Sequence, residues 1–109
     1  MTQNISLDLK NYGLLADGHK FDEVGSYEIL KGWAYIKVDP KLAHNAKVVD
    51  LEYAPTNKEG TISFSTEIFI LCPADKNRGN GKLFFDYGNR GNKRALQYFN
   101  DAVASNDHK

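Results

Sequence analysis

The segment from Lys82 to Arg94 has the residue types and spacing of a catalytic loop. Its apolar stretch Leu83–Tyr87 predicts an inner strand, and Gly88 and Gly91 follow directly. Two glycines three residues apart let the backbone turn sharply and can aim neighbouring N–H groups at one spot, as an oxyanion hole requires. Ordinary strand-to-helix loops use glycines in the same way, and spacing alone favours that simpler interpretation.

The rest of the chain lacks the motifs of other active sites. Gly79, Gly81 and Lys82 precede the predicted strand, and no Ser or Thr follows the lysine, so they do not form a phosphate loop. The histidines lack metal-ligand spacing; they are His19, His44 and His108. No serine lies in a Gly-x-Ser-x-Gly elbow; the serines are Ser6, Ser26, Ser63, Ser65 and Ser105. We therefore expect no catalytic residue, no metal and no cofactor.

Charge and cysteine content restrict the class of partner. The 14 basic residues balance 14 acidic ones, so no global field attracts nucleic acid, and we expect none as a partner. Cys72 ends the apolar run that begins at Ile68, which predicts a small buried thiol rather than a nucleophile. The basic residues near the loop predict a solvated rim of charge; they are Lys76, Arg78, Lys82, Arg90, Lys93 and Arg94.

The N-terminal sequence lacks the features of a signal peptide. No basic start precedes a long apolar core there, and no stretch of the chain approaches the roughly 20 apolar residues of a membrane span. We expect no membrane association and, by default, a cytoplasmic location.

Aromatic and β-branched residues predict most of the regular structure. Tyr27–Val38 is rich in them, with Gly32 as a bulge or bend and Asp39-Pro40 as the end of the strand. In Thr61–Leu71, Ile62, Phe64, Ile68 and Ile70 alternate with Ser63, Ser65 and Glu67, a period of two that indicates a strand. The remaining predicted strands are Lys47–Tyr53, Leu83–Tyr87 and a short one at Ile5–Leu9.

One helix is predicted near the C-terminus. Asn92 can cap it, and Leu96, Phe99 and Val103 share one face. The expected fold class is α+β, with a mainly antiparallel sheet of about four or five strands and one C-terminal helix. Residues 1–20 form a loosely ordered lead, 21–104 a single β-rich domain, and 105–109 a polar tail.

An ordered set of short motifs resembles the N-terminal part of a family of bacterial α/β-hydrolase-domain proteins. The matching pieces are Phe21–Gly32, Val38–Pro40, Asn45, Val49–Leu51, Ala54-Pro55, Ile70–Pro73, Gly79–Leu83 and Asn89–Lys93. The resemblance implies that the strands are the entry strands of an α/β-hydrolase fold. It also implies that Asn89, Arg90 and Gly91 stand in place of the His-Gly-Gly turn of related esterases and offer backbone N–H groups to an oxyanion.

The resemblance implies a function for the chain as part of a larger enzyme. The chain is expected to be an N-terminal fragment or split piece of a serine hydrolase acting on esters or related acyl compounds. It would supply the oxyanion-side loop but lack the nucleophile elbow and the triad, so it would not hydrolyse substrate efficiently by itself. Such a piece is expected to self-associate or to pair with a complementary hydrolase chain. The alternative is a free-standing β-rich binding or assembly module without catalytic activity.

Overall fold

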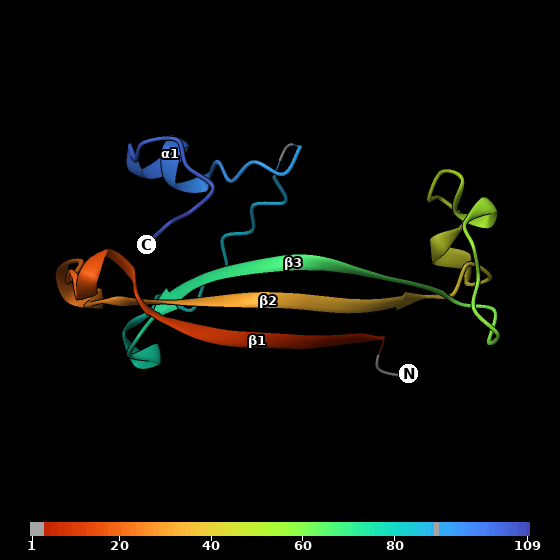
Figure 1. The fold of residues 1–109 in the computed structure, drawn as a ribbon, viewed down its shortest axis with the longest axis horizontal. Coiled ribbons are helices and arrows are strands. Elements are labelled where there is room, and N and C mark those ends of the chain that lie inside the picture. The colour runs from red at the N-terminus through yellow and green to blue at the C-terminus, as the bar shows by residue number, and fades with distance from the viewer. Residues whose placement is uncertain (1–3, 89) are drawn as a thin grey trace. The chain divides into compact units, whose positions relative to one another are not determined.

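The main element of the fold is a three-stranded antiparallel sheet (Figure 1). The structure, a computed structural model, describes residues 4–88 and 90–109. In the sheet, β2 (Tyr27–Val38) lies between β1 (Ile5–Leu14) and β3 (Ile62–Pro73), and α1 (Ala95–Asn100) is a short helix near the C-terminus. Short 3-10 helices lie in the connections, at Leu15–Gly18, Asp22–Val24, Ala43–Asn45, Leu51–Tyr53 and Lys76–Arg78.

The predicted fold class is wrong in its number of strands and in its specific likeness to a hydrolase. Three strands are present in the described residues instead of four or five, and they do not specifically resemble the entry strands of an α/β-hydrolase fold. The predicted strands Tyr27–Val38 and Thr61–Leu71 are confirmed as β2 and β3. The N-terminal lead contains a strand twice as long as expected, because β1 continues from Ile5 to Leu14.

The strand predicted at Lys47–Tyr53 is absent because this segment satisfies its backbone groups locally. Val48 N–H donates to the Asn45 carbonyl, and Leu51 N–H donates to the Val48 carbonyl, as in successive turns. Asp50 adopts a left-handed conformation with a φ of 61°, which interrupts an extended strand. The segment ends in a 3-10 helix instead.

The inner strand predicted at Leu83–Tyr87 is also absent. The large apolar side chains of this segment, those of Leu83, Phe84, Phe85 and Tyr87, are between 62% and 89% exposed. A continuous apolar run favours an inner strand only if neighbouring strands cover both of its faces. The described residues place no strand ladder on this segment, so its side chains remain at the surface.

The hydrogen bonds between strands define the register of the sheet. Lys37 N–H donates to the Asn4 carbonyl at 2.8 Å, and Ala74 N–H donates to the Ser26 carbonyl at 2.9 Å. Antiparallel strands that continue from these pairs place Tyr35 of β2 between Ser6 of β1 and Ser65 of β3. The same register puts Lys31 opposite Phe69, and the Lys31 ammonium indeed lies 5.6 Å from the centre of the Phe69 ring.

Alternation along the strands gives the sheet one polar and one apolar face at the end where β1 and β3 begin and β2 ends. The polar face carries Asn4, Ser6, Tyr35, Lys37, Ser63, Ser65 and Glu67; the apolar face carries Ile5, Leu7, Ala34, Ile36, Ile62 and Phe64. Ala34 and Ile62 of the apolar face are buried, at 3% and 8% exposure; Ile29, at 4%, is also buried, but it lies on the opposite face, with Tyr35 and Lys37. The predicted alternation of Ile62 and Phe64 against Ser63 and Ser65 matches this arrangement.

Gly32 lies inside β2, and the bulge or bend expected there stays a prediction. A Cβ at this position would lie 1.8 Å from the carbonyl oxygen of Asp8 on β1. Glycine is therefore required because the β1 backbone approaches β2 closely at this point.

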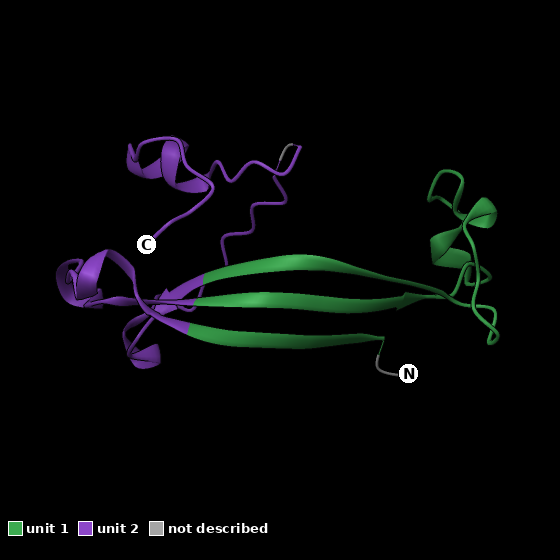
Figure 2. Cartoon of the chain, in the orientation of Figure 1, with its two compact units in different colours: residues 1–11, 30–70 green, residues 12–29, 71–109 purple. Residues whose placement is uncertain are grey.

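The chain divides into two compact units (Figure 2). Unit 1 comprises residues 1–11 and 30–70 and contains most of each strand. Unit 2 comprises residues 12–29 and 71–109 and contains α1 and the segment predicted to hold the catalytic loop. Each candidate site described below lies within one unit.

Asn57 holds the loop that leads into β3. Its Oδ1 accepts from the N–H groups of Glu59 and Thr61, both at 3.0 Å, and its Nδ2 donates to the hydroxyls of Thr61 at 2.6 Å and Ser63 at 3.2 Å. Asn57→Ala is expected to lower the free energy of unfolding by about 1–2 kcal/mol because these bonds are lost in an exposed loop. Urea unfolding measures the change. Asn57→Asp keeps the acceptor and should cost less; equal losses in the two variants would contradict this role.

Candidate functional site

The predicted oxyanion loop is organised around an internal carboxylate. Asp86 Oδ1 accepts from Gly88 N–H at 2.8 Å, and Oδ2 accepts from Arg94 N–H at 2.9 Å and Ala95 N–H at 3.0 Å. Ala95 is the first residue of α1, so Asp86 satisfies backbone donors at the start of the helix. The backbone N–H groups that converge here therefore meet an anion that the chain itself supplies.

The three predicted oxyanion residues have different outcomes. Asn89 lies outside the described residues. Arg90 and Gly91 are exposed and have left-handed φ values of 55° and 78°. Neither of them contributes the N–H groups that meet at Asp86, and their role as oxyanion donors stays a prediction.

The predicted helix is shorter than expected and is capped differently. It ends at Asn100 because Asp101 adopts a left-handed conformation with a φ of 54°, and Val103 lies beyond it. Arg94 is the residue at the N-cap position, and its side chain makes no capping hydrogen bond. Asn92, the predicted cap, instead accepts a hydrogen bond from Asn106 Nδ2 at 3.1 Å. Asp86 supplies the capping acceptor from eight and nine residues upstream.

These hydrogen bonds also affect the acidity of Asp86. The backbone N–H groups of Arg94 and Gly88, followed by that of Ala95, lower the pKa of the Asp86 carboxyl, because each stabilises the charged form. Burial acts in the opposite direction and is a larger cause than the Ala95 N–H, but the net effect is a lowered pKa. The carboxylate is therefore ionised at neutral pH, which suits an acceptor rather than a general acid.

Cys72 belongs to a small polar cluster in unit 2. Its thiol donates to the Glu28 carboxylate at 3.6 Å, and Lys76 Nζ donates both to that carboxylate and to the Pro73 carbonyl. The thiol is partly exposed rather than fully buried. Burial raises the pKa of Cys72; Lys76 lowers it, and Glu28 raises it further.

The raised pKa predicts a slow thiol. At neutral pH, Cys72 is expected to react with iodoacetamide several-fold more slowly than the same cysteine in the urea-unfolded chain, because the thiolate is the nucleophile. Glu28→Gln should accelerate the folded-state reaction by removing a charge that raises the pKa of Cys72. Alkylation of the folded chain at the unfolded rate, or faster, would contradict the assignment of Cys72 as an unreactive thiol.

The outer edge of β3 is one of the two open edges of the sheet, and the outer edge of β1 is the other. Because Ala74 N–H points toward β2, the even-numbered residues of β3 face β2 and the odd-numbered ones face outward. The five residues from Ser63 to Glu67 are all exposed. The sheet order makes β3 an edge strand, so the N–H and C=O groups of Ser63, Ser65 and Glu67 point away from the sheet.

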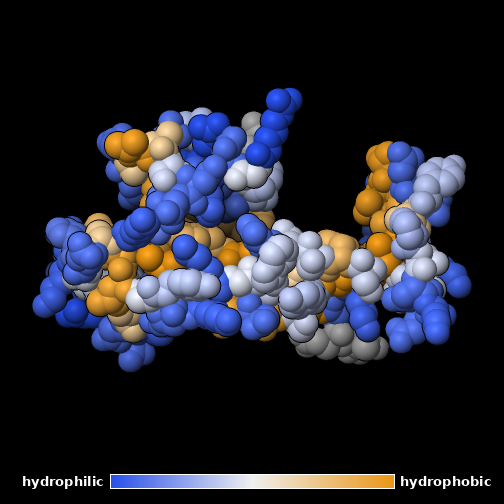
Figure 3. Space-filling view, viewed as in Figure 1, coloured by the Kyte–Doolittle hydropathy of each residue, from blue (hydrophilic) through white to orange (hydrophobic). Residues whose placement is uncertain are grey.

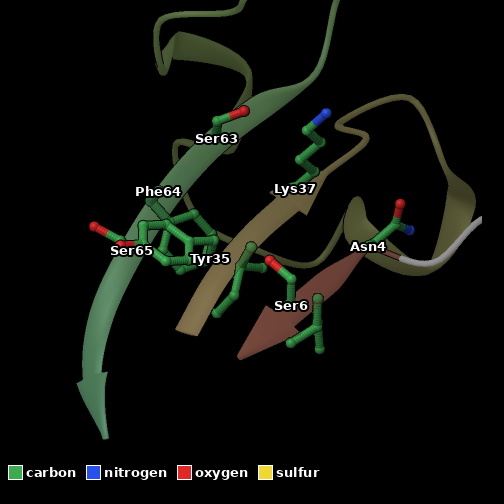
Figure 4. A pocket seen from close by; sticks show the side chains of 9 residues that line it. Asn4, Ser6, Tyr35, Lys37, Ser63, Phe64 and Ser65 are labelled. Atoms are coloured by element: carbon green, nitrogen blue, oxygen red, sulfur yellow. The ribbon is translucent and has the colours of Figure 1, made fainter. Parts of the chain in front are cut away.

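A depression of about 510 Å³ lies across the sheet at this part of β3 (Figure 4). Three consecutive rows of residues line it, each row running from β1 through β2 to β3. These rows are Asn4, Lys37 and Ser63; Ile5, Ile36 and Phe64; and Ser6, Tyr35 and Ser65. Figure 4 shows Ser63, Phe64 and Ser65 following one another along β3, with Tyr35 and Lys37 on the neighbouring strand.

The depression is lined by hydroxyl, amide, aromatic and aliphatic side chains and by one ammonium group. Its serines, Ser6, Ser63 and Ser65, need an adjacent base to act as nucleophiles. The described residues that line the depression include no histidine, cysteine or carboxylate. The Lys37 ammonium is its cation, and it lies 3.9 Å from the Glu59 carboxylate in a solvent-exposed ion pair.

Unit 1 also carries exposed apolar side chains on both edge strands and in a connection. Ile5, Leu7 and Phe64, on the apolar face of the sheet in unit 1, are 50%, 57% and 48% exposed. The connection between β2 and β3 adds exposed Leu42, Val48, Val49 and Tyr53. Figure 3 shows hydrophobic residues at the surface of this connection and over the strands. Exposed apolar surface of this kind commonly marks a protein interaction site.

The helices and the side-chain clusters of residues 4–88 and 90–109 bear on two further kinds of site, a membrane span and a metal site. There, α1 and the 3-10 helices fall short of the length and hydropathy of a membrane-spanning helix. Nor do three or more His, Cys, Asp or Glu side chains of these residues gather closely enough to hold a metal ion. A comparison with protein-family models, curated proteins and solved structures gives no match. The resemblance to α/β-hydrolase-domain proteins therefore stays a prediction.

Sequence reasoning did not identify the edge of β3 as a site. The alternation in Thr61–Leu71 predicts a strand, but it does not show which neighbours that strand has. One signal was present: β3 contains one charged residue, Glu67, and no proline before Pro73. Edge strands usually carry charges or prolines that block further pairing.

Proposed function

We propose that this chain is a β-rich binding and assembly module that accepts an extended segment of another polypeptide at the outer edge of β3. The observation that carries the proposal is the exposure of Ser63–Glu67, a stretch in which alternate backbone groups point away from the sheet. Strand addition to such an edge gains main-chain hydrogen bonds, and the flanking side chains provide specificity. The row containing Ile5, Ile36 and Phe64 offers apolar contact beside the edge.

The proposal assigns no catalytic step to the chain alone. The serines beside the edge have no base among the described lining residues, and the loop N–H groups that converge are engaged by Asp86. The predicted hydrolase role, with Asn89, Arg90 and Gly91 on the oxyanion side, also requires a second chain to supply the nucleophile. Pairing with another polypeptide is thus common to both functions. We retain the cytoplasm as the proposed compartment.

A photoreactive side chain tests the proposed function in cells that express the full chain. Placed at Ser65, it is expected to cross-link to a polypeptide, because Ser65 lies at the centre of the open edge. The matched control is Ser6, a serine on the same face and in the same row but on β1. Cross-linking at Ser65 but not at Ser6 supports the proposal. Absence of a polypeptide adduct at Ser65, or equal adducts at both positions, would refute it.

A further inference from the structure

We infer that the strand added to β3 is β3 of a second copy of this chain, antiparallel and centred so that Ser65 of one copy faces Ser65 of the other. The inference rests on the proposed function and names its partner. Antiparallel pairing about a twofold axis uses the same edge on both copies, so the interface is closed and isologous. Two three-stranded sheets would then join into one sheet of six strands.

The edge of β3 has few features that oppose such pairing. Natural edge strands are protected by charges, prolines, bulges or short length. β3 is 12 residues long, contains no glycine, and has its proline at its last position, Pro73. Glu67 is its one charged residue. The opposite edge strand, β1, carries Asp8, Lys10 and Gly13.

The direction of the backbone groups selects which residues can bond across the interface. Odd-numbered residues of β3 point outward, so they form the hydrogen-bonded pairs with the second copy. With the axis at Ser65, the two Ser65 residues exchange hydrogen bonds, and Ser63 of each copy exchanges them with Glu67 of the other. The five exposed residues Ser63–Glu67 lie at the centre of this pairing.

Charges favour an axis at Ser65 over one at Glu67. An axis at Glu67 would set two carboxylates directly opposite each other, which destabilises a strand pair. An axis at Ser65 sets each Glu67 carboxylate opposite the Ser63 hydroxyl of the other copy. The Ser63 hydroxyl accepts from Asn57 Nδ2 at 3.2 Å and keeps its own proton for donation. Lys37 lies in the same row as Ser63. Its ammonium would therefore lie about 10 Å, or two strand spacings, from the Glu67 carboxylate of the other copy.

The apolar face continues across the same interface. Phe64 of one copy lies opposite Thr66 of the other, and Ile62 lies opposite Ile68, since these residues share the face turned away from Ser63 and Ser65. The apolar face of the sheet in one copy therefore continues onto the apolar face of the sheet in the second copy. Cross-strand contacts between aromatic and β-branched side chains stabilise such pairs.

The other extended apolar segment of the chain is a weaker candidate for the added strand. Leu83–Tyr87 is exposed, but its Asp86 carboxylate is already bonded to the backbone of Arg94 and Ala95. Using this segment as an edge strand would displace the bonds that begin α1. On the outward side of β3, the Glu67 carbonyl accepts a long hydrogen bond from the Thr66 hydroxyl at 3.5 Å, and its second lone pair can accept from a second copy.

Sedimentation equilibrium of the purified full chain tests the inference through charges at Ser65. The unchanged chain is expected to form dimers, and Ser65→Lys and Ser65→Glu should each raise the dimer dissociation constant about fivefold or more, because like charges then face each other. An equal mixture of the two variants should recover dimers, since lysine then faces glutamate. Recovery also shows that both variants fold. Lys10→Glu, an exposed position on the same face but on β1 at the opposite edge, should leave the dissociation constant unchanged.

The outcomes separate this inference from the proposed function. If dimers form but the Ser65 variants dimerise as well as the unchanged chain, the inference is wrong, and cross-linking at Ser65 decides the proposed function. Lack of recovery in the mixture also contradicts the register. If the purified chain is monomeric at every concentration, a second copy is not the partner. Cross-linking at Ser65 in cells then decides the proposed function independently.

Discussion

Gly32→Ala is expected to lower the free energy of unfolding by about 3 kcal/mol, although alanine normally stabilises a strand relative to glycine. The new Cβ would lie 1.8 Å from the Asp8 carbonyl oxygen and 2.8 Å from its carbon. Both atoms belong to the backbone of β1, so no side-chain rotation relieves the clash. β1 has to move away from β2, and the interstrand hydrogen bonds near this point weaken.

The control for Gly32 is a glycine with an ordinary φ and a milder contact. At Gly79 a Cβ would lie 3.3 Å from the ring carbon Cγ of Pro73, a side-chain atom. Gly79→Ala should therefore cost much less than Gly32→Ala when both are measured by urea unfolding. Fast hydrogen exchange at β1 amides in the Gly32 variant would locate the damage. An equal cost for the two variants would contradict the close approach of β1 to β2.

Asp86→Ala is expected to unfold α1 and release the Gly88–Arg94 loop while the sheet persists. Three backbone donors, the N–H groups of Gly88, Arg94 and Ala95, lose their shared acceptor. Hydrogen exchange resolved by residue should show rapid exchange at Arg94 and Ala95 in the variant. Asp86→Asn retains one carbonyl oxygen and should have an intermediate effect.

Acid should reproduce the Asp86 effect in the unchanged chain. Hydrogen bonding lowers the folded-state pKa of Asp86 below the unfolded value of about 3.9. Its contribution to stability is therefore present above the unfolded pKa and is lost as the pH falls through the folded pKa.

Asp101→Asn, at the other end of α1, is the control for Asp86→Ala, since asparagine tolerates the left-handed conformation there. Protection of Arg94 and Ala95 that survives Asp86→Ala would contradict the capping role.

Two of the strands were predictable because their patterns depend on local properties. Tyr27–Val38 is rich in residues that favour strands, and Asp39-Pro40 restricts the backbone at its end. The alternation of Ile62 and Phe64 with Ser63 and Ser65 requires an extended backbone with one apolar face. Neither inference needs knowledge of distant neighbours.

The wrong strands share a different cause. Leu83–Tyr87 and Lys47–Tyr53 are apolar enough for strands, but an apolar run forms one only when a neighbouring strand takes up its backbone groups. In the second segment, i→i+3 bonds such as that from Leu51 N–H to the Val48 carbonyl take up those groups. Near the first segment, the Asp86 side chain accepts Gly88 N–H and favours a turn.

The candidate sites show the same division between local and distant information. The sequence located a glycine loop after Leu83–Tyr87, but the use of Asp86 as a cap depends on an acceptor eight and nine residues away. The open edge of β3 depends on strand order, because the same alternating pattern suits a strand with one neighbour or two. The sequence shows that β3 has one charged residue, Glu67. Only the strand order shows that β3 is an edge strand, where scarce charge leaves the edge open to pairing.

Isotope-filtered nuclear Overhauser spectroscopy on a dimer of labelled and unlabelled chains tests the central claim most directly. In the inferred register, Phe64 and Thr66 of the two copies form a pair without hydrogen bonds between them, in which the facing Cα atoms lie about 4.5 Å apart. We predict an intermolecular contact between the Phe64 and Thr66 α-protons. Absence of this contact in a dimer, or intermolecular contacts confined to β1, would contradict strand addition at the edge of β3.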